Sequence, residues 1–240
     1  MRLASLTAAA FLAGTGAAHA VVTFDISAQG LADAQAVESN FLSGLNSIVT
    51  EDFEGFSAAA SQVASPLNTA VGQFRATGDP GTGNCIGSCT DLAILDSGTT
   101  PFGGRVNTTG GGTNWLDSND VSEVTWDLGG GIAPTANAFG LFVSDANDVD
   151  ASVEITTAGG TYSVALPNGG GTAPNGDVYY VSALSTTTIN AASVVFDNDG
   201  STNDGFGIDD VSVAVPEPAT LGLLGAGLAG IGLAARRRRT

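Results

Sequence analysis

The sequence predicts a mainly β domain, a two-sheet antiparallel β-sandwich of jelly-roll type with one short N-terminal helix. Three observations predict this fold. Short apolar runs recur along the chain, and some alternate with polar residues as half-buried strands do. The 34 glycines are spread between these runs, as turns require. Lysine is absent and glutamate scarce, which disfavours helices. A barrel or a right-handed solenoid is a less favoured alternative.

The first 20 residues have the parts of a secretory signal peptide. Arg2 supplies the positive start, and residues 3–13 supply an apolar stretch that is too short to span a membrane. Ala18-His19-Ala20 matches the small-x-small cleavage pattern. We therefore expect export and a mature chain that begins at Val21.

One helix is predicted, over residues 31–45. Leu31, Ala34, Val37, Phe41 and Leu42 recur at helical spacing with polar residues between them, and a glycine at position 44 can end the helix. We expect this helix to pack against a sheet.

The strands begin after the helix. Residues 121–128 alternate apolar and polar side chains, which places Trp126 in the core, and Gly159-Gly160 between two runs indicates a hairpin. The longest loop is residues 97–113, either a binding loop or plain surface. The predicted strands are residues 48–54, 73–76, 92–95, 121–128, 138–143, 152–156, 161–166, 178–183, 192–196 and 206–213.

The C-terminal segment has three parts in a fixed order. A Pro-Glu-Pro motif precedes an apolar stretch, residues 219–235, and four arginines follow. As a transmembrane helix the stretch would be about 25 Å long, at the short limit for a bilayer core. The arginines place the cytoplasmic side, so the domain lies outside. A plain tail anchor is the alternative on physical grounds.

These three parts closely resemble the sorting signal of PEP-CTERM proteins, the exosortase substrates of Gram-negative bacteria. The resemblance implies export by the Sec translocon, transient residence in the inner membrane, and cleavage by an exosortase near the motif. It also implies delivery to the cell surface or extracellular matrix. The domains would be a signal peptide (1–20), a β-sandwich (21–214) and a sorting signal (215–240). The sorting residues would be Pro216, Glu217, Pro218, Arg236, Arg237, Arg238 and Arg239.

The charge of the central domain excludes some functions. Between residues 21 and 215, 23 acidic residues face only Arg75 and Arg105, a net charge of −21. Such a surface repels phosphate backbones, so nucleic-acid binding is not expected. The only histidine, His19, leaves with the signal peptide, which removes any histidine-based catalysis. We expect no enzyme; the alternative is a carboxylate-dependent glycan hydrolase or lyase.

The two cysteines, Cys85 and Cys89, are separated by three residues that include a glycine. In an exported chain they are expected to close a small disulfide loop. The spacing differs from Cys-x-x-Cys, so a redox role is disfavoured.

Two acidic runs could hold calcium. Residues 197–205 carry oxygen ligands at alternate positions, which suits a hard cation, although they depart from the EF-hand pattern. A calcium loop with Asp197, Asp199 and Asp204 as ligands and a plain turn are equally favoured here. Residues 145–150 pose the same choice, with the turn favoured.

A second resemblance concerns the two ends of the domain. Asp52-Phe53-Glu54-Gly55 and the run Gly207-Ile208-Asp209-Asp210-Val211 are similar to the opening and closing signatures of calcium-stapled carbohydrate-binding jelly rolls. The resemblance implies that the first and last strands lie together. It also implies a structural calcium held by Glu54 and by Asp209 or Asp210, with backbone carbonyls. The alternative is that Asp209 and Asp210 only cap or turn the last strand.

These features predict a non-enzymatic structural or adhesive surface protein that binds calcium and polysaccharide. A lectin-like carbohydrate-binding module is the main alternative. A sugar ligand requires aromatic platforms, and Trp115, in a polar loop, is the candidate expected to face it.

Overall fold

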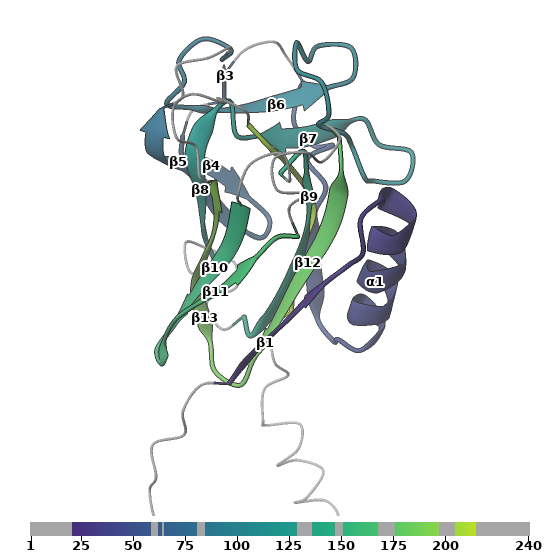
Figure 1. Ribbon diagram of the computed structural model, residues 1–240, viewed down its shortest axis with the longest axis vertical. Helices are drawn as coiled ribbons and strands as arrows, with labels where there is room; N and C mark the ends of the chain where they lie inside the picture. Colours follow the sequence, from purple (N-terminus) through teal and green to yellow (C-terminus); the bar gives the residue numbers. More distant parts are fainter. Residues whose placement is uncertain are drawn as a thin grey trace, which may run out of the picture.

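The computed structural model describes residues 21–58, 62–63, 65–80, 85–128, 136–146, 151–167, 176–196 and 205–214. These residues form two antiparallel sheets and one helix, which confirms the predicted sandwich (Figure 1). The jelly-roll connectivity stays a prediction. The expected signal peptide and sorting signal lie outside the described residues. In the ranges above, no helix is long and apolar enough to cross a membrane.

The larger sheet has eight strands within the described residues, and its centre is the last strand of the domain. β14 pairs with β9 on one side and with β7 and β2 on the other, so early and late segments of the chain meet there. In spatial order the strands are β1 (Val22–Ile26), β12 (Val178–Ser185), β9 (Ala138–Ser144), β14 (Gly207–Ala214), β7 (Asn114–Asp117), β6 (Leu92–Asp96) and β3 (Gln62–Val63), with β2 (Ile48–Glu51) also on β14.

The smaller sheet has six described strands. In spatial order they are β11 (Gly160–Ala165), β10 (Ala151–Thr157), β13 (Ile189–Phe196), β8 (Val121–Asp127), β5 (Gly72–Pro80) and β4 (Leu67–Thr69). The predicted hairpin is present, because β10 and β11 pair with Thr157 opposite Gly160.

Aromatic rings join the two sheets. Trp126 of β8 stacks on Phe74 of β5, with ring centroids 5.4 Å apart. The same indole meets the edge of Phe139 in β9, on the opposite sheet, at 5.3 Å. Such offset and edge-on pairs are the favoured ring geometries, and each ring also removes a large apolar area from water. The prediction that Trp126 lies in the core is confirmed.

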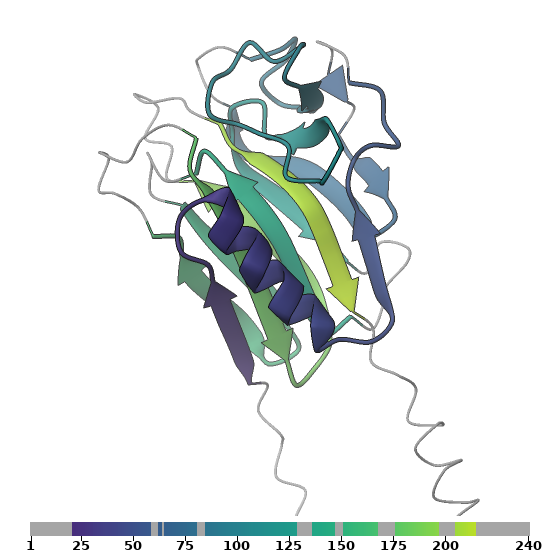
Figure 2. The ribbon, with the colours of Figure 1, turned by 90° about the vertical axis from the view of Figure 1, so that its right-hand side faces the viewer.

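The predicted helix is present as α1 (Leu31–Ser43), and it lies across the outer face of the larger sheet (Figure 2). Ala34 is fully buried, and Val37 and Phe41 pack beside it on Phe142 and Tyr180. The other face of the helix is exposed, as its polar residues indicate.

Four of the described strands were not expected from the sequence: the short β3 and β4, and also β1 and β7. β1 begins one residue after the expected start of the mature chain, and its Val22, Phe24 and Ile26 pack against the core. β7 lies in a stretch expected to be a polar loop, at the end of residues 97–113. It is a strand because it pairs with β6, and briefly with β14, rather than because of its own four residues.

Candidate functional site

Strand pairing brings the two acidic signatures together. β2 runs antiparallel to β14 with Glu51 opposite Val211, so the turn that follows β2 lies beside Asp209 and Asp210. The pairing of β14 with β9 shifts register between Asp209 and Ser212. Asp210 has a positive φ of 43° at this irregularity, which is a left-handed conformation that aspartate tolerates. The expected meeting of Glu54 with the last strand therefore occurs in the structure.

The two carboxylates converge on one atom. Nδ2 of Asn107 lies 3.2 Å from Oε1 of Glu54, 3.2 Å from Oδ2 of Asp209 and 2.8 Å from the backbone oxygen of Asn114. An amide nitrogen carries only two hydrogens, so it cannot satisfy three acceptors fully at once. Three oxygens, two of them from carboxylates, thus surround a single position.

Asp209 also holds the glycine- and threonine-rich loop. Its Oδ2 accepts hydrogen bonds from the backbone N–H of Thr108 at 2.6 Å and of Thr109 at 3.3 Å, and from the Thr108 hydroxyl at 3.0 Å. Only 2% of Asp209 is exposed. Burial raises the pKa of this carboxyl to about 7; the Thr108 N–H opposes the rise and the neighbouring Asp210 adds to it.

Glu54 holds the other end of the same loop. Its Oε1 accepts the backbone N–H of Thr113 at 2.6 Å and of Asn114 at 2.7 Å. The Asn114 side chain in turn donates to the backbone oxygens of Phe53 and Phe56. The loop between residues 107 and 114 is therefore fastened at both ends to acids from opposite ends of the domain.

Asp210 faces a different set of groups. Its two oxygens accept hydrogen bonds from the hydroxyls of Thr108, at 3.1 Å, and Thr109, at 2.7 Å. Burial raises the pKa of Asp210; the two hydroxyls lower it, and the charges of Asp52 and Glu54 raise it further. Of the two neighbouring aspartates, Asp209 is the one that converges with Glu54.

The convergent oxygens have the chemistry that a hard cation such as calcium prefers. In the part of the chain that the structure describes, no group of three or more acidic, histidine or cysteine side chains is placed to hold a metal ion. A cation at Glu54 and Asp209 would therefore need amide and carbonyl oxygens as well. The second expected calcium loop, with Asp197, Asp199 and Asp204, lies outside the described residues.

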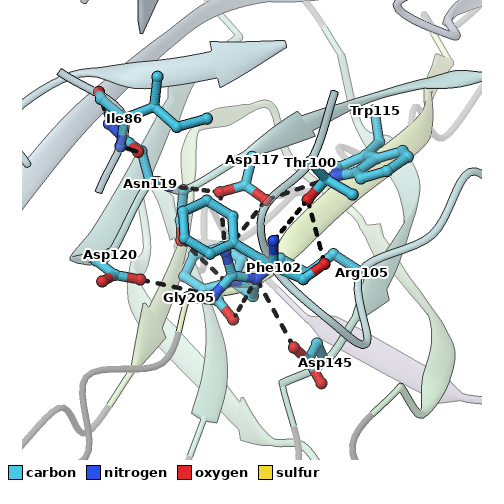
Figure 3. A network of polar contacts seen from close by, with 12 residues as sticks. Ile86, Thr100, Phe102, Arg105, Trp115, Asp117, Asn119, Asp120, Asp145 and Gly205 are labelled. Carbon is cyan, nitrogen blue, oxygen red and sulfur yellow. Dashed lines mark hydrogen bonds and ion pairs between the residues drawn. The ribbon is translucent and has the colours of Figure 1, made fainter. Parts of the chain in front are cut away.

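A second charged site surrounds Arg105 (Figure 3). The guanidinium is buried, with Nη1 3.3 Å from Asp117, Nη2 3.6 Å from Asp120 and Nε 3.7 Å from Asp145. Nε also donates to the backbone oxygen of Gly205 at 3.0 Å. One arginine thus joins the loop before β7, the turn after it, the end of β9 and the approach to β14.

Buried negative charge exceeds positive charge at this second site. The ring of Phe102 covers the Arg105 guanidinium at 4.3 Å, and the indole N–H of Trp115 and the backbone N–H of Asn119 donate to Asp117. Burial raises the pKa of Asp117, and the Arg105 charge opposes that rise. No local sequence pattern connects the residues of this network. The one signal was that Arg105 is one of only two basic residues in an acidic domain.

The disulfide loop is attached to the same region. Cys85 and Cys89 are bonded, with their sulfur atoms 2.01 Å apart. The side chain of Asn119 accepts the Ile86 N–H at 2.7 Å and donates to the backbone oxygens of Ile86 and Ser88. The turn after β7 therefore fixes the disulfide loop next to the Arg105 network.

The expectation that Trp115 faces a ligand is not met. Trp115 is 1% exposed and packs in β7 against Ala93, Leu95 and Phe102. Its indole N–H is directed at Asp117, so neither its ring face nor its polar atom is available to a sugar. The cause is that Phe102 of the preceding loop and Ile86 of the disulfide loop pack over this face of β6 and β7 and cover the indole.

Comparison with known families places residues 214–239 in the family described as the PEP-CTERM protein-sorting motif. The chain carries a PEP-CTERM sorting signal. It is therefore an exported, surface-sorted substrate of an exosortase. The matched segment begins at Ala214, which is also the buried last residue of β14.

Outside the PEP-CTERM motif, similarities are remote. No curated protein matches the chain. Among solved structures, a family 6 carbohydrate-binding module is 15% identical and covers 52% of this chain and 94% of its own, with a TM-score of 0.28. CBM35 from Cellvibrio japonicus Abf62 is 19% identical (52% and 94%, TM-score 0.27). Caldicellulosiruptor saccharolyticus CBM27-1 is 12% identical (72% and 100%, TM-score 0.30). These similarities identify neither a ligand nor a site in this chain.

Proposed function

We propose that this protein is a non-enzymatic structural or adhesive component of the cell surface or extracellular matrix. The observation that carries the proposal is the attachment of the sorting motif directly to the last strand of a folded β-sandwich. The Sec translocon exports the chain, the inner membrane holds it transiently, and the exosortase frees the domain from the membrane. The strong net negative charge keeps such a domain soluble after release.

The carboxylates support a structural role. A glycan hydrolase needs two carboxyl groups that face a substrate cleft and act as acid and base. Asp209 and Glu54 instead accept backbone N–H groups from the loop that they hold, and Asp209 is buried. Their hydrogen bonds stabilise the fold at the position where catalysis would require open access.

The sorting step is tested by replacing Pro216, Glu217 and Pro218 together with alanine. The variant should accumulate in the membrane fraction at its full length, because the exosortase no longer recognises it. A matched control is Pro101→Ala, which changes a proline of the folded domain. Normal release of the triple variant would contradict the proposal, and so would equal retention of the control.

Calcium is proposed as a structural cofactor at the convergent oxygens. Glu54 and Asp209 would hold it, with the backbone oxygen of Asn114 and the side-chain oxygen of Asn107, and Asp210 would add charge nearby. When bound, the ion would neutralise two carboxylates and fasten the end of β2 to β14. A separate loop site at Asp197, Asp199 and Asp204 remains part of the proposal.

Thermal unfolding with calcium and then with EDTA tests the cofactor. Millimolar calcium should raise the Tm by several degrees, and Glu54→Gln should abolish the rise. Glu154→Gln, on the other sheet, is the control and should keep it. An equal Tm with calcium and with EDTA would remove calcium from the proposal while leaving the sorting function intact.

Polysaccharide is the proposed partner, and a lectin-like function is the second candidate. The outer face of the smaller sheet supports it, because hydrogen-bonding side chains pair across that face. Examples are Thr77 with Thr125 at 2.7 Å and Gln73 with Asn68 at 2.7 Å, beside the exposed Arg75. The electrophoretic mobility of the wild-type protein should be lower in gels that contain extracellular polysaccharide than in plain gels. Gln73→Ala should restore the mobility seen in plain gels. Identical mobility in all gels would reject the binding function.

A further inference from the structure

Helix α1 is held to the larger sheet by a small contact. Ala34 is the only fully buried residue of the helix, and Phe41 adds an edge-on contact with Tyr180 at 6.2 Å. The helix also makes a polar contact: the side chain of Gln35 donates a hydrogen bond to the backbone oxygen of Thr108 at 3.3 Å. Small changes in the energy of this contact therefore change how firmly the helix is docked.

An acidic residue lies on the docking face. Glu38 follows Ala34 by four residues, so both occupy the same side of the helix, and Glu38 is half-buried where Asp33 is exposed. The groups that face it are Tyr180 of β12 and Asp210 of β14. Asp210 is itself surrounded by the charges of Asp52 and Glu54, with Asp209 beside it in the strand. Glu38 on the docking face is thus subject to the negative charge of Asp210, and Asp52, Glu54 and Asp209 add negative charge around Asp210 rather than around the helix.

No basic side chain compensates this charge among the described residues. The domain has no lysine, and its two arginines lie elsewhere. Arg75 is exposed on β5 of the other sheet, and Arg105 is buried with Asp117, Asp120 and Asp145.

Tyr180 marks the same place from the sheet side. Its ring is fully buried beneath α1, packed edge-on against Phe142 at 4.9 Å, and its hydroxyl lies over the bare backbone of Gly140. That hydroxyl has no hydrogen-bond partner among the described residues. Both Glu38 and Asp210 are near enough for their charges to raise the pKa of Tyr180, after the larger effect of burial. A buried hydroxyl without a hydrogen-bond partner among the described residues therefore lies within the electrostatic reach of both acids.

We infer that α1 is a strap whose docking depends on a proton held by Glu38, so that the helix is fixed in acid and released as the pH rises through neutrality. Release uncovers Tyr180 and Phe142 on the outer face of the sheet. The proposal goes beyond sorting and surface delivery, since it concerns a response of the delivered domain to its surroundings.

The direction of the effect follows from linkage. Burial, and then the charge of Asp210, raise the pKa of Glu38 from 4.5 to about 7 in the docked state. A carboxyl whose pKa is raised by docking favours docking at low pH, and that contribution is lost between pH 4.5 and about 7. If the whole rise in the pKa of Glu38 depended on docking, deprotonation would change the docking equilibrium by roughly 300-fold. Because Glu38 is half-exposed, solvent screening reduces the expected change to about tenfold.

Hydrogen exchange measured by mass spectrometry tests the strap. The full chain in mild detergent, with EDTA present, is compared at about pH 5 and about pH 8, and each exchange rate is divided by the intrinsic rate at that pH. Protection of residues 31–43 should be about tenfold lower at the higher pH, while β9 and β12 keep theirs. Glu38→Gln should keep the helix protected at both values. Asp33→Asn, on the exposed face, should retain the full pH dependence.

Three outcomes would overturn the proposal. The first is equal protection of α1 at both pH values in the wild type. The second is an unchanged pH dependence in Glu38→Gln; should that variant fold poorly, Glu38→Ser is measured in its place under the same criterion. The third is full restoration of protection at about pH 8 by calcium, which would make a cation the docking element in place of a proton.

Discussion

Arg105→Met tests how much the buried charge network contributes to stability. It removes the positive charge that Asp117, Asp120 and Asp145 share and keeps a long, unbranched side chain. Asp117, Asp120 and Asp145 are at most 2% exposed, so each loses its counter-charge without gaining water. The hydrogen bond from Nε to the Gly205 oxygen is lost as well. Breaking a buried pair by removing one partner costs about 3–5 kcal/mol. For a domain of this size that corresponds to a fall in Tm of roughly 6–20 °C.

Chemical denaturation and differential scanning calorimetry measure this change. Arg75→Met is the matched control, because Arg75 is the other arginine of the domain and is exposed on β5; its effect should be within about 0.5 kcal/mol. Burial already raises the pKa of Asp117, and loss of the guanidinium, which opposes that rise, raises it further. The stability deficit should therefore be full near neutral pH and shrink as the pH falls toward about 4.

A double variant separates charge from packing. Arg105→Met combined with Asp120→Asn removes one uncompensated charge and should be more stable than Arg105→Met alone. A free energy of unfolding for Arg105→Met within about 1 kcal/mol of the wild type would refute the view that the arginine balances this network. An equal loss in Arg75→Met would refute it too.

Three further changes have defined outcomes. Tyr180→Phe removes a buried hydroxyl without a partner and should raise the free energy of unfolding by about 1 kcal/mol in urea titrations; a decrease would show that the hydroxyl is hydrogen-bonded. Gly140→Ala places a methyl group against the hydroxyl end of Tyr180 and should destabilise the domain by about 1–3 kcal/mol, partly recovered by adding Tyr180→Phe; no loss would contradict the close approach. Replacing Cys85 and Cys89 together with serine opens a loop of sequence separation 4 and should cost about 2 kcal/mol, less than Arg105→Met, in the same titrations; a larger cost would give the loop a wider role.

Local pattern predicted the elements whose own residues decide their structure. The 3.6-residue period of α1 and the alternation around Trp126 were sufficient, because each element buries one face that its own sequence defines. β7 was not predictable in this way. Its four residues, Asn114–Asp117, read as a polar loop, and only the pairing with β6 makes them a buried strand.

The two charged sites differ in the same respect. Glu54 and Asp209 lie in short signatures that a resemblance can recognise, so their meeting was expected. Arg105 reaches Asp120 and Asp145 only after β7, β9 and the approach to β14 have assembled, and no local pattern connects these residues. Sequence showed an isolated positive charge in an acidic domain; the folded chain shows what it balances.

The central position of β14 has a consequence for the order of events during export. Until residues 207–214 are available, the described strands of the larger sheet form two separate groups, β1-β12-β9 and β7-β6-β3, and β2 lacks the strand with which it pairs. A chain that crosses the membrane N-terminus first therefore cannot complete its core until β14 has crossed, although most of the domain is by then already outside the membrane. Strands that are far apart in sequence also pair more slowly than local structure forms. Since the sorting motif starts where β14 ends, the last segment needed for folding and the first residue of the motif emerge together. Export of β14 therefore permits two events at once: the larger sheet can close, and the sorting signal begins to emerge.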